Sequence, residues 1–244
     1  MGCESTDPDP KEHQDIIIYQ TGRLQDWCYR NTSSSYTALK RAKTYTEGAF
    51  DRTQHTCSVE YRTEACNPDR DCYNTFEQEH PCFGSQVEYN HAGSYFFDWV
   101  TCGRDTGDDA TLLLSYCDGT TSGGRVMSAD EGICWALTGK YIAQLPSTYY
   151  DYGSSNCYDG METALHELGH CFMQRRDCAD PDHSDHHYGN AYTEPFENKH
   201  YLTPMGIWNK IDPDENACCK PHETDGTRYY DMTWSECSIA AWGC

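Results

Sequence analysis

The chain has 244 residues and carries 39 acidic side chains against 18 basic ones, a formal net charge of -21. This length suffices for one well-buried domain, and the acidic balance argues against nucleic acid or an anionic membrane as a partner, because both attract basic surfaces. No apolar run approaches the roughly 18 residues that a membrane span requires.

The 16 cysteines include no Cys-x-x-Cys pair, and such a composition indicates a disulfide framework rather than cytosolic thiols. We therefore expect an extracellular protein. The start, Met1-Gly2-Cys3-Glu4, lacks the basic and apolar regions of a signal peptide, so we expect that an export signal has been removed. The glycosylation sequon Asn31-Thr32-Ser33 agrees with export. A reduced intracellular protein is the alternative.

Residues 1–14 are polar and contain two prolines, which predicts a flexible arm. A single domain then covers 15–244, with an N-terminal lobe at about 15–172 and a C-terminal lobe at about 173–244. The β-branched run over 15–19 predicts a buried strand. Serines 33–35 can cap a helix over 36–50, whose inward-facing residues are Tyr36, Leu39, Ala42 and Ala49.

Residues 57–82 contain four cysteines and few apolar side chains, so we expect disulfides to hold this stretch. Strands are predicted over 111–116 and 132–137, with a turn at Gly123-Gly124, and a short helix near 233–241. The order of elements predicts an α/β fold. In it a twisted mixed sheet carries a backing helix, and an irregular, disulfide-rich lobe ends the chain in a helix.

Between these parts, residues 159–174 contain His166-Glu167-x-x-His170. Asp159 can cap a helix here, with Glu162 closing a capping box. Helical spacing places the two histidines one turn apart on one side, where both can bind one zinc ion while Glu167 activates its water. The helix is further indicated by an apolar face made of Met161, Ala164, Leu165, Leu168 and Phe172.

A catalytic zinc needs three protein ligands and an open position for water. The compact extended motif would have Gly at 173 and His at 176, where this chain has Met173 and Arg176. The third ligand must therefore come from farther along, and residues 178–189 are dense in donors. His200 and His222 are weaker candidates, because neither has neighbouring donors.

Downstream, Thr203-Pro204-Met205-Gly206 follows the zinc helix. The chain here resembles the metzincin metalloproteases, which have a zinc helix, a third histidine and a methionine in a tight turn beneath the metal. The segment around Trp135 is placed like the metzincin edge strand that binds peptide in extended form. Trp234-Ser235-Glu236-Cys237 resembles the start of the C-terminal helix in some members. The likeness covers roughly residues 130–240, and the acidic, Lys-poor composition is similar to that of secreted haloarchaeal proteins.

This resemblance implies a metzincin-like sheet lobe and His186, in Asp185-His186-x-x-Gly189, as the third zinc ligand. His187 and His183 are the next candidates. It also implies that Met205 supports the site by packing, not by coordination. Some metzincins have a tyrosine two residues after this methionine; the chain has Ile207 there, so no such tyrosine is predicted.

A competing resemblance is to the aspzincins, whose Asp-x-x-Tyr-Gly signature matches Asp185-x-x-Tyr188-Gly189. It would make Asp185 the third ligand and Tyr188 a transition-state stabiliser. The Gly-Thr pair that usually precedes this signature is replaced by Pro181-Asp182, and the methionine turn would go unexplained.

Together these residues predict a secreted zinc endopeptidase acting on peptide or protein substrates. Zinc would lower the pKa of its bound water and polarise the scissile carbonyl. Glu167 would take the water proton and deliver it to the departing amine. Two alternatives remain: a non-catalytic, cysteine-rich extracellular binding protein, and a zinc hydrolase acting on a non-peptide amide.

Overall fold

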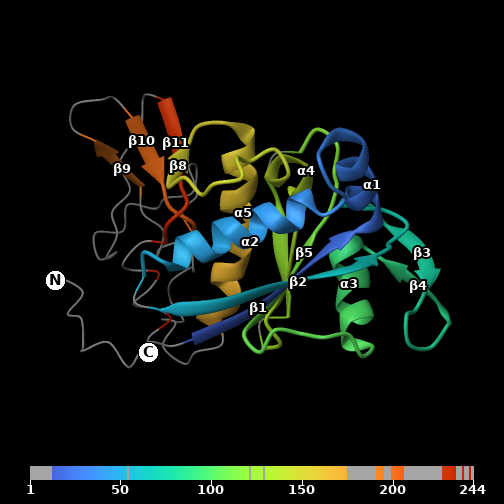
Figure 1. Cartoon of the computed structure of the whole chain (residues 1–244). Coiled ribbons are helices and arrows are strands. Elements are labelled where there is room, and N and C mark those ends of the chain that lie inside the picture. The colour runs from blue at the N-terminus through green and yellow to red at the C-terminus, as the bar shows by residue number, and fades with distance from the viewer. Residues whose placement is uncertain are drawn as a thin grey trace.

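A computed structural model describes residues 13–53, 55–120, 122–128, 130–174, 191–194, 199–205 and 227–234, together with residues 238 and 242. Its centre is a mostly parallel sheet with the strand order β2-β1-β5-β7-β6 (Figure 1). Only β6 runs antiparallel to its neighbour. These strands are β1 (His13–Thr21), β2 (Thr56–Cys66), β5 (Ala110–Leu114), β6 (Gly124–Ser128) and β7 (Ile133–Ala136).

Two smaller sheets flank this centre. A mixed sheet has the order β8-β11-β10-β9, and a separate hairpin joins β3 and β4. Their strands are β3 (Phe76–Glu79), β4 (Gln86–Tyr89), β8 (Tyr152–Gly153), β9 (Ala191–Glu194), β10 (Lys199–Leu202) and β11 (Thr227–Asp231).

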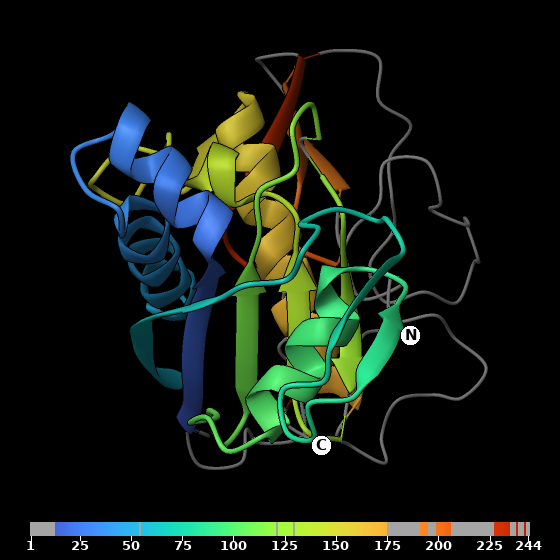
Figure 2. The same ribbon diagram turned by 90° about the vertical axis from the view of Figure 1, so that its right-hand side faces the viewer.

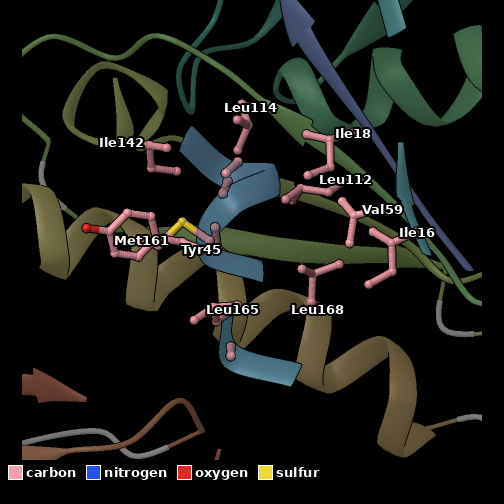
Figure 3. Packing of buried hydrophobic residues seen from close by; sticks show 14 of the residues in the cluster. Ile16, Ile18, Tyr45, Val59, Leu112, Leu114, Ile142, Met161, Leu165 and Leu168 are labelled. Atoms are coloured by element: carbon pink, nitrogen blue, oxygen red, sulfur yellow. The ribbon is translucent and has the colours of Figure 1, made fainter. Parts of the chain in front are cut away.

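Helices cover both faces of the central sheet, which creates two hydrophobic clusters. The helices are α1 (Gly22–Asn31), α2 (Thr37–Phe50), α3 (Ala92–Thr101), α4 (Gly139–Ile142) and α5 (Asn156–Gln174). On one face α2 and α5 pack over Ile16 and Ile18, and on the other α3 packs over Ile17 and Tyr19. In Figure 2 the central strands stand between α2 and α3, and Figure 3 shows Leu165 and Leu168 of α5 in the first cluster.

The alternation within β1 explains why its apolar run is continuous. Because successive side chains of a strand point to opposite faces, a strand buried on both sides needs apolar residues at every position. Ile16, Ile17, Ile18 and Tyr19 are all at most 7% exposed. The predicted α/β class is confirmed, as are the strands that correspond to β1, β5 and β7 and the helix that corresponds to α2.

Two expectations about the N-terminal half were wrong, the second of them only in part. Tyr36 precedes the helix α2 and makes no side-chain capping bond, whereas Ser34 accepts the N–H of Tyr36 at Oγ and that of Thr37 at its carbonyl. The stretch expected to be held by disulfides also contains the 11-residue strand β2. Cys57 and Cys66 lie in that strand as free thiols, whereas the disulfides Cys72–Cys117 and Cys82–Cys102 do form. Within the described residues, no helix has the length and apolar character for a membrane span.

Candidate metal centre

The two motif histidines lie one turn apart on α5 and point to the same place. The Nε2 atoms of His166 and His170 are 3.1 Å apart, and their ring planes are nearly perpendicular, at 82°. The position of both histidines is fixed because the other face of α5 is buried in the hydrophobic core. The residues of that face are at most 3% exposed: Met161, Ala164, Leu165, Leu168 and Phe172.

The start of this helix differs from the prediction. The helix begins at Asn156, so Asp159 lies in its first turn and does not cap it. The carbonyl of Ser155 accepts the N–H groups of Tyr158 and Asp159 instead. Glu162, expected to complete a capping box, is buried, and burial raises the pKa of its carboxyl well above the ordinary value.

The spacing of the two Nε2 atoms fits a shared zinc ion. Zinc binds histidine nitrogens at about 2.0–2.1 Å in tetrahedral geometry, which puts two ligand nitrogens about 3.3 Å apart. The observed 3.1 Å is close to this value. Both imidazoles could therefore coordinate one ion without any rearrangement of α5.

Glu167 is held beside this pair under the outermost strand of the central sheet. Its side chain is buried, with 7% of the residue exposed. A Cβ atom added at Gly124 of β6 would lie 2.6 Å from Cγ of Glu167 and 2.7 Å from Oε1. Burial raises the pKa of this carboxyl to about 8, and the positive charge of Arg125 opposes the rise. The glycine thus leaves the space that the carboxyl group occupies.

Met205 packs against α5 from another side, between the turns that carry the two histidines. A Cβ at Gly169 would lie 2.5 Å from Sδ of Met205 and 3.2 Å from Nε1 of Trp234. Met205 is fully buried and has a φ of 77°. Among the described residues it is the one non-glycine residue with a positive φ, a conformation that L-residues adopt at a cost. The tight turn after β10 therefore places this methionine at the helix.

The segment around Trp135, expected to be an edge strand, lies inside the central sheet. Trp135 lies in β7, which is flanked by β5 and β6 in the central sheet. Its ring is fully buried, and its Nε1 donates a hydrogen bond to Oγ of Ser115 over 2.7 Å. The outermost strand on this side is β6, where the sequence predicts only the turn at Gly123-Gly124. The polar and glycine content of β6 gave it no clear apolar period.

Tyr73 was also missed, although it reaches the same edge. Its hydroxyl donates a 2.7 Å hydrogen bond to the carbonyl of Gly124. Its ring is half exposed and packs edge-on against Trp135 and His91. The neighbouring disulfide Cys72–Cys117 anchors this loop. Tyr73 therefore forms part of the surface next to Glu167, a role that one tyrosine among 19 could not reveal.

The candidates for the third ligand lie outside the described residues. These are His183, Asp185, His186 and His187, together with Tyr188 of the competing signature and the weaker candidate His222. His200 lies in β10, paired with Thr193 and Arg228.

A second cluster of side chains could hold a metal ion, and it is far in sequence from the His166–His170 motif. The ligand atoms of His80, Cys82 and Cys102 lie within 4.8 Å of one another. The two sulfur atoms are joined in a disulfide, however. The ring nitrogens of His80 face the N–H of Cys82 at 3.1 Å and the carboxylate of Asp98 at 3.2 Å. Metal binding here would require reduction of the disulfide and rotation of the imidazole.

No protein-family model matches the chain, and no curated protein sequence matches it.

Proposed function

We propose that this chain is a secreted zinc-dependent endopeptidase whose metal is held by His166 and His170. The observation that carries the proposal is the pair of Nε2 atoms 3.1 Å apart, with the buried carboxyl group of Glu167 on the adjoining helix position. Two surface histidines on an amphipathic helix would not require a buried acid beside them, since burying an acid is costly.

Glu167 would act as the proton carrier of the reaction. When bound, a zinc ion supplies an activated water and polarises the carbonyl to be cleaved. With a pKa near 8 in the metal-free protein, the Glu167 carboxyl readily holds a proton. A dication bound by the histidines would lower that pKa, because an opposite charge favours the ionised form. The carboxylate can then accept a proton at Oε1 and later donate it to the departing amine.

The outermost strand supports a peptide as the substrate. β6 pairs with β7 on one side, and Gly124 packs against Glu167. An extended peptide could add to the other side of β6 through backbone hydrogen bonds, as in other cases of strand addition, at positions other than the Gly124 carbonyl, which accepts the Tyr73 hydroxyl. Its scissile bond would then pass close to Glu167. The metzincin resemblance implies an edge strand that binds peptide in extended form. We assign this role to β6 in place of the segment around Trp135.

For the third ligand we propose His186, on the resemblance described above. The packing of Met205 against Gly169 supports the metzincin arrangement. The aspzincin alternative, with Asp185 as ligand and Tyr188 as a stabilising group, gives Met205 no role. The disulfides agree with an extracellular location.

The test is a paired assay of zinc content and proteolysis. Wild type, Glu167→Ala and the control Glu131→Ala, which alters an exposed acid near β6, are measured for zinc per chain. Cleavage of an unfolded, disulfide-free protein is followed at high and low salt. We expect about one zinc in each, with cleavage lost only in Glu167→Ala.

Two other outcomes would contradict the proposal. Equal zinc and no cleavage by wild type at either salt concentration would leave a binding protein or a hydrolase of another amide. Wild-type protein without zinc, after exposure to the metal, would refute the metal centre itself.

A further inference from the structure

Strand β7 and helix α5 each contribute a fully buried cysteine to the interface between them. Cys134 lies in the middle of β7, and Cys171 directly follows His170 on α5. Both are 0% exposed and belong to the same hydrophobic cluster. Burial first, and the neighbouring thiol of Cys171 second, raise the pKa of the Cys134 thiol well above its ordinary value, so the two thiols lie near each other. Neither takes part in the disulfides Cys72–Cys117 and Cys82–Cys102.

The register of the two elements independently brings these cysteines together. At one rung of the sheet Gly124 pairs with Ala136 and contacts Glu167. Two residues along β7, at the rung where Val126 pairs with Cys134, the strand has advanced about 6.6 Å. Four residues along α5, from Glu167 to Cys171, the helix has advanced about 6 Å on the same face. The similar advances place Cys171 over the rung that Cys134 forms with Val126.

The other described free thiols face different groups, and Cys157 lies 2.8 Å from Oγ of Ser155. Cys28 lies near the backbone of Ala38, Cys57 near the charges of Glu47, Asp51 and Lys43, and Cys66 near Asp71. A thiol pair in contact is a different situation, because one sulfur can attack a mixed disulfide formed on the other.

We propose that Cys134 and Cys171 form a disulfide that ties α5 to β7. The two thiols lose two protons and two electrons, and the S–S bond forms between their sulfur atoms. The oxidant is an external disulfide, on a protein oxidoreductase or a small thiol compound, which is reduced to two thiols through a mixed disulfide. Because both sulfurs are buried in the folded chain, the exchange takes place during folding, before α5 closes on the sheet.

The bond would anchor α5 one residue beyond His170, so it would restrain the helix that carries both motif histidines. The disulfide itself does not depend on the proposed function. A chain without zinc or proteolytic activity would still contain it, and its absence would leave the zinc and cleavage assays unaffected as tests.

The experiment is a peptide map of the wild-type chain secreted into an oxidising medium. The protein is unfolded in denaturant with N-ethylmaleimide and no reductant, then cut by trypsin and an enzyme that cleaves after glutamate. Cleavage at Glu131 and Lys140 isolates Cys134 on residues 132–140, and cleavage at Glu167 and Arg175 isolates Cys171 on residues 168–175. This digestion separates Cys171 from Cys157, which trypsin alone would leave on the same peptide.

We expect the two fragments as one cross-linked species that carries no maleimide and separates on reduction. Maleimide on both cysteines, or a link from either one to a different cysteine, would overturn the proposal. Cys171→Ala should convert Cys134 into a reactive thiol, whereas the matched control Cys28→Ala should leave the cross-link intact. Reduction should lower the Tm of wild type more than that of the double variant Cys134→Ala/Cys171→Ala, because only wild type has this cross-link to lose.

Discussion

Replacing Glu167 with glutamine should remove a pH dependence of stability from the metal-free protein. The folded-state pKa of this carboxyl is about 8, against an ordinary value of 4.5. The buried site therefore favours the protonated form. Its contribution to stability is fully present below pH 4.5 and is lost as the pH rises through 8. Glutamine keeps the shape of the side chain and has no proton to lose.

The size of the effect follows from the two pKa values. Each pKa unit of difference corresponds to about 1.4 kcal/mol. Between pH 5 and pH 8.5 the metal-free wild type should therefore lose roughly 4 kcal/mol relative to Glu167→Gln. This is a large part of the stability of an ordinary domain, about 5–15 kcal/mol. Because Glu167 is only 7% exposed, solvent screening reduces the figure little.

The assay is urea unfolding in the presence of a chelator at several pH values from 5 to 8.5. Wild type, Glu167→Gln and the exposed-site control Glu131→Gln are compared at each pH. The control should follow wild type. Stability curves that stay parallel for wild type and Glu167→Gln would refute the argument, since they would show that Glu167 ionises in the fold without cost. Added zinc should reduce the difference, because a nearby dication stabilises the carboxylate.

Three further substitutions test the packing around the centre. Gly124→Ala should lower kcat/KM on the order of 100-fold with zinc content unchanged, because the new Cβ displaces Glu167; wild-type cleavage rates would contradict this. Gly169→Ala should destabilise the protein by about 1–3 kcal/mol in urea unfolding, because its Cβ would overlap Met205; unchanged stability would show that the methionine turn yields freely. Tyr73→Phe should cost about 1 kcal/mol, the hydrogen bond to Gly124, and an equal or higher midpoint of unfolding would count against that bond.

The sequence predicted elements well where burial alone determines the residue type. The run Ile16-Ile17-Ile18 is apolar on both faces, so it identifies an inner strand without knowledge of its partners. Strand β2 lies at the opposite edge of the sheet, and of its residues only Val59 and Cys66 are buried. Its polar pattern is stabilised by pairing with β1 over a long parallel register. That pairing is non-local, so no periodicity within the segment itself indicates it.

The starts of helices were misplaced or missed where the capping residue is unusual or is one of several candidates. Several residues near the start of α5 can cap a helix, and the choice of Asp159 placed the first turn four residues too late. Helix α3 begins at an unusual cap. Nδ1 of His91 accepts the N–H of Ser94, and Oγ of Ser94 accepts the N–H of His91. Histidine is not among the residues that favour this position, and the aromatic residues that follow indicated no element.

The candidate centre was predictable only along α5, because the histidines and Glu167 are neighbours in one helix. Its other parts come from β6 and from the turn at Met205. No local sequence pattern indicates that these segments contact the helix. What they share is glycine at the point of contact. Gly124 makes room for the Glu167 carboxyl, and Gly169 makes room for Met205. Neither glycine has a positive φ, so neither is required by a turn. Their purpose is close approach, and a glycine inside a strand or helix costs stability unless something occupies the space it leaves. In this protein that space is filled on one side by the proposed proton carrier and on the other by the methionine beneath the helix.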